Sequence, residues 1–130
     1  MNQTNIAESG KKKILIVDDS ASLRESIKQT LEDADTIFIE CDDGADAFDL
    51  YKENIPDWVL MDIQMKKVDG ITAARQIRNT FPESNIIFVT QYDNIRLREI
   101  AKSIGGNGYV LKQNLFDLRE IINNSNYQEL

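Results

Sequence analysis

Short apolar runs alternate with amphipathic stretches along the chain, and this alternation predicts its secondary structure. Five runs of β-branched and large apolar residues are typical of buried strands, near residues 13–17, 36–40, 58–61, 86–89 and 109–111. After each run, apolar residues recur at the three- and four-residue spacing of a helix face. After the first run these are Leu23, Ile27 and Leu31, with Ser22 and Glu25 placed as a capping box at the helix start.

Strands that alternate with helices predict βαβ units around a parallel sheet. The later helices have recognisable ends: we expect Asp69 to cap the third helix and Gly105 to end the fourth. The apolar residues expected on the fourth helix are Ile95, Ile100 and Ile104. With right-handed crossovers, the predicted fold is α/β. It is a flavodoxin-like, doubly wound, five-stranded parallel sheet in the order 2-1-3-4-5, with helices on both faces.

Length and composition predict one domain at residues 12–123, between a flexible N-terminal segment 1–11 and a frayed tail or linker start at 124–130. No apolar run approaches the roughly 18 residues of a membrane span, so we expect a cytoplasmic protein without membrane contact. The net charge of -7 argues against nucleic-acid binding by this domain alone. The absence of histidine excludes histidine-dependent nucleophiles and zinc sites, and the single Cys41 excludes an internal disulfide.

Polar and ionisable residues stand where four of the predicted strands end. Asp18 and Asp19 close the first run, Asp62 the third, Thr90 the fourth and Lys112 the fifth. The carboxyl ends of parallel strands meet in one crevice, so the three carboxylates would gather there. They would repel one another unless a hard divalent cation were bound. The alternative is that each acid is only a turn or helix-start residue.

These motifs resemble those of the receiver domains of bacterial response regulators, over roughly residues 12–122. The shared segments are Ile-Val-Asp-Asp-Ser around Asp18, Leu-Met-Asp-Ile-Gln-Met around Asp62, Phe-Val-Thr ending at Thr90 and Gly-Tyr-Val-Leu-Lys ending at Lys112. An acidic pair alone occurs by chance, but the ordered set at four strand ends is specific. The resemblance implies a phosphoacceptor signalling domain of a two-component system. It would not be an enzyme beyond self-phosphorylation from a donor and slow autodephosphorylation.

The resemblance also implies a role for each acid. Asp62 would be the phosphoacceptor, since a carboxylate can attack phosphorus to give an acyl phosphate. Asp19 and Asp62 would ligate Mg²⁺ directly, Asp18 directly or through water, and the backbone carbonyl of Gln64 would complete the site.

By the same resemblance, Lys112 would pair with Asp62 at rest and then with a phosphoryl oxygen, and Thr90 would donate its hydroxyl to another. Thr90 and Tyr109 would form the switch, the ring of Tyr109 turning from solvent into the space that Thr90 leaves. Taken one at a time, Thr90 and Tyr109 are equally typical of packing residues, and Lys112 of a surface lysine.

The implied partners are a sensor histidine kinase or a histidine phosphotransfer protein. A homodimer would pair through the face of the fourth helix, fifth strand and fifth helix, where opposite charges can meet twice across a two-fold axis. The residues expected on this face are Arg96, Arg98, Tyr109, Asp117 and Arg119.

Three positions depart from the family pattern. Lys66 and Gln113 stand where proline is common, so the loop after Asp62 should be more mobile and the shape of the loop after Lys112 is open. Gln91 stands where a small residue leaves phosphodonors an open path, so access to Asp62 should narrow. We also expect a nearby Trp58 to sense the binding of Mg²⁺.

Two other functions stay open on the sequence alone. One is an interaction module with this fold that is controlled without phosphorylation, a pseudo-receiver; the intact set of acids, Thr90 and Lys112 argues against it. The other is a Mg²⁺-dependent phosphatase with an aspartyl nucleophile. That class usually carries Asp-x-Asp at its first strand end, whereas Asp18 and Asp19 are adjacent.

Overall fold

The computed structural model describes residues 10–123. The predicted tail at 124–130 lies outside these residues, and so does the predicted N-terminal segment 1–11 apart from Gly10 and Lys11. The first strand begins at Lys12 and the last helix ends at Asn123. The domain limits at 12 and 123 remain a prediction.

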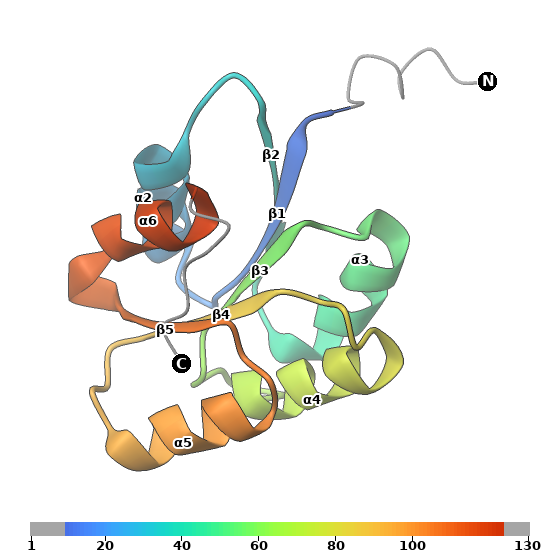
Figure 1. Cartoon of the computed structure of the whole chain (residues 1–130), viewed down its shortest axis with the longest axis vertical. Helices are drawn as coiled ribbons and strands as arrows, with labels where there is room; N and C mark the ends of the chain where they lie inside the picture. The colour runs from blue at the N-terminus through green and yellow to red at the C-terminus, as the bar shows by residue number, and fades with distance from the viewer. Residues whose placement is uncertain (1–9, 124–130) are drawn as a thin grey trace.

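A parallel sheet in the order β2-β1-β3-β4-β5 forms the centre of the molecule and confirms the predicted fold class (Figure 1). Its central strands are runs of apolar residues, as expected where helices cover both faces. The strands are β1 (Lys12–Val17), β2 (Thr36–Cys41), β3 (Trp58–Met61), β4 (Ile86–Thr90) and β5 (Gly108–Leu111).

Helices cover both faces of the sheet, as predicted, and each face has its own apolar core. Helices α2 and α6 pack on one face, whereas α3, α4 and α5 pack on the other (Figure 1). The α-helices are α2 (Ala21–Leu31), α3 (Ala47–Asn54), α4 (Gly70–Thr80), α5 (Ile95–Ser103) and α6 (Phe116–Asn123). Two 3₁₀ turns, η1 (Gly44–Asp46) and η2 (Lys112–Asn114), lie before α3 and α6.

Side-chain caps fix where α2, α4 and α5 begin, and the cap of α5 is Asn94. Asp69 caps α4 by accepting a hydrogen bond from Thr72 N at 2.8 Å, which confirms the predicted start of that helix. The predicted capping box of Ser22 and Glu25 is wrong: Ser20 caps α2, accepting from Leu23 N at 3.2 Å, so the helix begins earlier. An earlier start shortens the link between β1 and its helix.

The apolar face of α5 differs from the prediction. Ile95 is the first helical residue and is 76% exposed, so the prediction that it faces the core is wrong. Ala101 is buried instead, with Leu97 packed partly against the same core. Ile104 packs against this core as predicted. This stripe also has helical spacing, and a short residue at its centre lets α5 lie close to the sheet.

The register of the sheet aligns the strand ends that carry the polar residues. Val17 pairs with Met61, so Asp18 and Asp62 leave β1 and β3 at the same level. Asp62 N donates to Val17 O at 2.8 Å, which extends the ladder by one residue. On the far side, Thr90 ends β4 opposite Leu111 of β5, and Lys112 follows at once. The four strand ends therefore converge at one edge.

Trp58 lies at the amino end of the strands, opposite the end that carries the acidic site. It opens β3 whereas Asp62 follows its end, and four residues of strand span about 13 Å. Trp58 lines a hollow with Lys12 and Asn85, at the amino ends of the strands. The prediction that Trp58 lies near the acidic site is therefore wrong.

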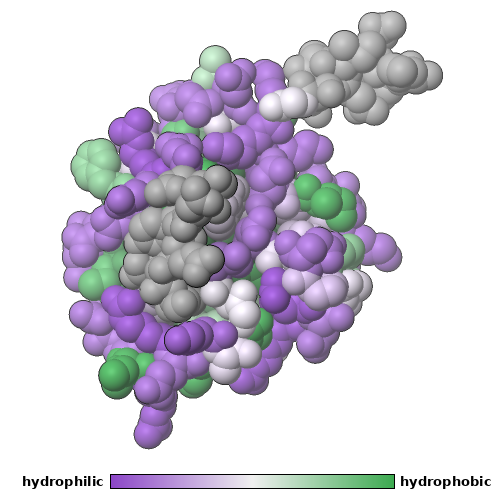
Figure 2. All heavy atoms as spheres, in the orientation of Figure 1, coloured by the Kyte–Doolittle hydropathy of each residue, from purple (hydrophilic) through white to green (hydrophobic). Residues whose placement is uncertain are grey.

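Hydrophilic side chains dominate the molecular face in Figure 2, and the apolar residues on it form small separate groups. Within residues 10–123, no helix combines the length and the apolar character that crossing a membrane requires.

Candidate functional site

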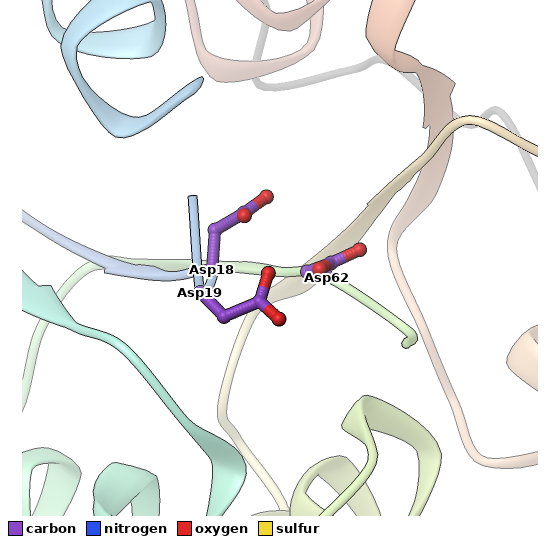
Figure 3. Close-up of side chains that lie close together, drawn as sticks. All are labelled: Asp18, Asp19 and Asp62. Carbon is purple, nitrogen blue, oxygen red and sulfur yellow. The ribbon is translucent and has the colours of Figure 1, made fainter. Parts of the chain in front are cut away.

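Three carboxylates converge beyond the ends of β1 and β3, as the sequence predicted (Figure 3). Asp18 and Asp62 are buried, Asp19 is exposed, and each offers an oxygen within 4.8 Å of the others. Asp18 N donates to Cys41 O at 3.0 Å, and its Oδ1 accepts from Ser20 N at 2.8 Å. The acidic pair is thus held in place by the main chain around it.

Lys112 lies among these acids rather than on the open surface. Its Nζ is 3.1 Å from Asp18 Oδ2 and 3.3 Å from Asp62 Oδ1, and its side chain is 19% exposed. One ammonium therefore serves two buried carboxylates, while Asp19 adds a further negative charge beside them. Three carboxylates thus face one ammonium, and this cluster carries a net negative charge.

Two pKa shifts show how burial and charge act at the site. Burial, and after it the negative charge of Asp18, raise the pKa of Asp62 to about 6, against the opposite effect of Lys112. Burial alone would lower the pKa of Lys112, but Asp18 and Asp62 outweigh it and raise that pKa above its ordinary value. Lys112 is therefore cationic at neutral pH, and ionisation of Asp62 is costly without further positive charge.

The residues present fit a divalent cation. The acids supply hard oxygen ligands at mutual distances that one ion can bridge, and the excess negative charge would be neutralised by it. Gln64, two residues after Asp62, lines the same hollow, which is where the predicted backbone ligand should be. Asp18, Asp19, Asp62 and the carbonyl of Gln64 are the residues that would hold Mg²⁺.

The site opens into a hollow of about 330 Å³ that brings together most of the predicted site residues. Lys112 and Thr90 line this hollow together with Asp62. The lining residues are Asp19, Ser20, Leu23, Asp62, Gln64, Thr90, Gln91, Tyr92 and Lys112.

The chain matches the model of a known family. The family model described as "Response regulator receiver domain" matches residues 14–124. The chain belongs to this family. The predicted resemblance is confirmed, and the protein is a receiver domain of two-component signalling, a signalling domain rather than a typical enzyme.

Individual relatives agree with this assignment. The receiver domain is 36% identical over 101 residues to the chemotaxis protein CheY of Halobacterium salinarum, covering 78% of this chain and 84% of that protein. It is 33% identical over 110 residues to the response regulator MprA of Mycobacterium sp. (strain KMS), covering 85% of this chain. Only 47% of MprA is covered, so the chain spans about half the length of that relative.

Solved structures give the same answer. A two-component response regulator of the LuxR family from Aurantimonas sp. SI85-9A1 superposes with a TM-score of 0.84 at 27% identity, covering 92% of this chain and 89% of that one. A CheY-like receiver domain protein from Methanospirillum hungatei JF-1 superposes with a TM-score of 0.80 at 25% identity, covering 87% and 91% of the two chains.

The two predicted switch residues of the receiver domain are linked through the main chain of Tyr92. Thr90 is buried, and its Oγ1 accepts from Tyr92 N at 3.2 Å. The Tyr109 hydroxyl donates to Tyr92 O at 2.7 Å. The Tyr109 ring is 2% exposed and lies under the guanidinium of Arg98, 4.5 Å from the ring centre. The ring thus already occupies the inward position to which the switch hypothesis moves it.

Three residues near the site make contacts that were not predicted from the sequence. Arg24 Nη1 donates to Asp18 O at 2.6 Å, and its Nε pairs with Glu40 at 3.0 Å, so α2 and β2 support the acidic pair. Tyr92 joins the switch through its main chain, which its side-chain type does not reveal. Asp43 contacts the loop after Asp62, although the sequence shows it only as part of an Asp-Asp-Gly turn.

The structure shows the local conformation and contacts at the three positions that depart from the family pattern. The peptide bond between Lys112 and Gln113 is trans, as are the other peptide bonds of residues 10–123. Gln91 is exposed and lines the hollow above Asp62, where it was expected to narrow access. The loop that carries Lys66 is anchored to the neighbouring turn by Asp43.

Proposed function

We propose that this receiver domain accepts a phosphoryl group on Asp62 with Mg²⁺ bound beside it, and that the resulting change is read at a protein surface. The observation that carries the proposal is the cluster of Asp18, Asp19 and Asp62, whose oxygens lie within 4.8 Å of one another beside the ammonium of Lys112. Nucleophile, cation ligands and a second positive group are all present in one hollow.

In the transfer step, a carboxylate oxygen of Asp62 attacks the phosphorus of the donor. The bond from phosphorus to the leaving nitrogen or oxygen breaks, and an acyl phosphate remains on Asp62. Mg²⁺, when bound, supplies neutralisation of the charge on the phosphoryl oxygens. Because the pKa of Asp62 is about 6, the carboxylate is mostly ionised at neutral pH and can act as the nucleophile.

The positive and hydroxyl groups have complementary roles in this proposal. Lys112 Nζ lies 3.3 Å from Asp62 Oδ1, so it can move from the carboxylate to a phosphoryl oxygen with a small change of its stem. Thr90 lines the same hollow and would donate its hydroxyl to another phosphoryl oxygen while still accepting from Tyr92 N. The phosphoryl group would therefore pull the Thr90 side chain toward Asp62.

Receiver domains interact with histidine kinases or phosphotransfer proteins. We propose that such a protein, with phosphohistidine as donor, serves this chain. The hollow above Asp62 offers the path by which the donor group would approach, past Gln91. The cytoplasmic location expected from the sequence remains a prediction.

We place the readout on the face of α5, β5 and α6, which flank the sheet edge formed by β5 (Figure 1). Ile95 and Phe116, the first residues of α5 and α6, are 76% and 74% exposed. Arg96 lies on α5 and Asp117 on α6, so a two-fold dimer could set acids against bases at its rim. Arg119 lines a hollow with Lys12 and Leu31 instead, away from this face. Under the proposal this face binds either a second copy of the chain or a different partner protein.

The alternatives lack a supporting observation. A pseudo-receiver that is controlled without phosphorylation would not need the acids, Thr90 and Lys112 around one hollow. A phosphatase would need the acid arrangement of a different family.

The test is covalent labelling of Asp62. With acetyl phosphate and Mg²⁺, the intact mass of the wild type should rise by one phosphoryl group, and Asp62→Asn should remain unlabelled. Asp57→Asn is the matched control, because Asp57 is an exposed acid just before the first residue of β3, whereas Asp62 follows the last. This variant should gain the phosphoryl group as the wild type does. Folded wild type that gains no mass, or Asp62→Asn that is labelled at the wild-type rate, contradicts the proposal.

A further inference from the structure

A buried carboxylate outside the acidic cluster binds the loop that follows Asp62. Asp43 is 7% exposed, and its oxygens accept three main-chain hydrogen bonds. Its Oδ1 accepts from Ala45 N at 2.9 Å and from Val68 N at 3.0 Å, and its Oδ2 accepts from Lys67 N at 2.9 Å. Two of these donors belong to the loop between β3 and α4, far along the chain.

The loop between Asp62 and α4 is held at both ends by other bonds. Gly70 N donates to Ile63 O at 2.8 Å, which closes the loop at its base. A side chain at Gly70 would collide with the main chain of Asp62, so α4 starts directly against the acceptor residue. Asp43 adds an anchor in the middle of this loop. With Lys67 and Val68 fixed, the stretch between anchors shortens to residues 64–66.

Close packing of main chain on main chain supports the same contact. A Cβ atom at Gly44 would lie 2.5 Å from Val68 O and 3.2 Å from Asp69 O, so the turn before α3 rests directly against the loop. Cys41 also donates its Sγ–H to Asp43 O at 2.9 Å, which ties the turn to the end of β2. The anchor is therefore itself fixed to the sheet.

We propose that Asp43 is a positioning residue for the phosphoacceptor site: it fixes the main chain of the loop on which Gln64 presents its carbonyl to the cation. This inference rests on the proposed function, because it assigns the purpose of the anchor to that site. Lys66 lies in the same stretch without the fixed φ that a proline would give, so the restraint comes from Asp43 instead.

Charge explains why a carboxylate suits this place. Hydrogen bonds from the amides of Lys67 and Ala45 hold the pKa of Asp43 below its ordinary value, so it stays ionised across the neutral range. An ionised carboxylate accepts all three amides, whereas an asparagine side chain would turn its NH₂ group toward one of them. Asp43→Asn therefore loosens the anchor while keeping its size.

Asp43→Asn is the test variant, and Asp42→Asn is its matched control. Asp42 is the exposed neighbour in the same turn, so its substitution changes the local charge equally without removing the anchor. Two measurements are needed: amide exchange of residues 63–68 in the folded protein without metal, and the Mg²⁺ affinity by calorimetric titration with the metal alone. For Asp43→Asn we expect faster exchange in this loop, unchanged exchange in β1 and about tenfold weaker Mg²⁺ binding. Asp42→Asn should stay within about twofold of wild type.

A purely structural role would lower the melting temperature and leave the Mg²⁺ affinity of the folded protein unchanged, which would overturn the inference. If Asp43→Asn does not fold, Gly44→Ala decides, since its added Cβ displaces Val68 with Asp43 intact. Wild-type Mg²⁺ affinity in a folded Gly44→Ala variant would also overturn it. Failure of wild type to accept a phosphoryl group would refute the proposed function, while the exchange and Mg²⁺ measurements would still decide the role of Asp43.

Discussion

Two buried acids of this receiver domain differ in pKa because their oxygens contact different groups. Asp43 accepts three amide hydrogen bonds, which lower its pKa, so its charge is compensated within the fold. Asp62 shares one ammonium with Asp18 and is buried, which raises its pKa to about 6. Ionised Asp43 therefore stabilises the fold, whereas ionised Asp62 destabilises it until a cation is supplied.

The first residue-scale prediction is a pH dependence that Asp62 controls. Its pKa in the fold is about 6, above the ~3.9 of an unfolded aspartate, so the folded state binds the proton more tightly. The free energy of unfolding without metal, relative to Asp62→Asn, should thus be highest below about pH 4. It should fall by ~1–3 kcal/mol as pH rises through about 6 and then level off. Urea unfolding in the presence of a chelator measures it.

Mg²⁺ should reverse this trend, because the metal needs the ionised carboxylate that the proton occupies. The rise in melting temperature on adding Mg²⁺ should be larger at about pH 8 than at about pH 5. Asp62→Asn, measured alongside, should lose most of this difference. An equal rise at both pH values in wild type would show that Asp62 is not a ligand.

At this scale the sequence revealed groups whose role depends on strand position and missed those whose role depends on long-range main-chain contacts. Asp18, Asp62 and Lys112 were predicted to meet because strand ends converge, and they do. Asp43 looked like a turn residue because its partners lie 24 and 25 residues away and use only their amides. The prediction for Trp58 was wrong because the first residue of a strand lies a strand length away from the site at its carboxyl end.

At the scale of elements, the end of α3 stores strain at a single residue. Ile55 has φ of 45°, a left-handed conformation that a β-branched residue rarely adopts, and Ile55 N donates to Tyr51 O at 2.7 Å. Glycine adopts this conformation without a Cβ penalty. Since Ile55 is 55% exposed, little packing is lost, and Ile55→Gly should stabilise the domain by about 1 kcal/mol.

Urea unfolding of Ile55→Gly and Ile55→Ala separates relief of the left-handed conformation from loss of the exposed apolar side chain. Ile55→Ala removes the same apolar surface but keeps a Cβ atom, so it should gain much less. Equal stability of the two variants, or a loss in Ile55→Gly, would mean that the left-handed residue is not strained.

The elements were predictable where one local rule decided, and less so where tertiary contacts did. Asp69 capped α4 as expected because its position before Gly70 left a single candidate. The capping-box pattern predicted Ser22 as the cap of α2, but Ser20 caps it, because the connection to β1 is shorter than the pattern indicated. On α5 the sequence predicted an apolar face that includes Ile95, whereas packing against the sheet buries the stripe of Leu97, Ala101 and Ile104.

At the scale of the whole molecule, strand order followed from the alternation of strands and helices together with right-handed crossovers. The same topology carries the proposed signal, because β4 and β5 are neighbours at the edge of the sheet and α5 and α6 flank β5 (Figure 1). A change at Thr90 on β4 needs to cross only one strand to reach the readout face. The contacts that connect them, through Tyr92, could not be inferred from the sequence.

The last prediction concerns this path. A phosphoryl group on Asp62 would draw Thr90 toward it, and Thr90 Oγ1 holds Tyr92 N while Tyr92 O accepts from the Tyr109 hydroxyl. Beryllofluoride, a stable mimic of the phosphoryl group, should therefore change amide exchange along α5 and the start of α6. Thr90→Ala should still bind Mg²⁺ but lose this response, because it lacks the hydroxyl that links site and main chain.

Tyr109→Phe separates the hydroxyl from the ring in the same experiment. The variant keeps the ring beneath Arg98 but removes the hydrogen bond to Tyr92 O, so beryllofluoride should bind normally while exchange on α5 responds less. Sedimentation of each variant with and without beryllofluoride then shows whether the response changes association through this face. A full exchange response in Tyr109→Phe would place the link elsewhere. No response on α5 in wild type would mean that the signal leaves the domain by another surface.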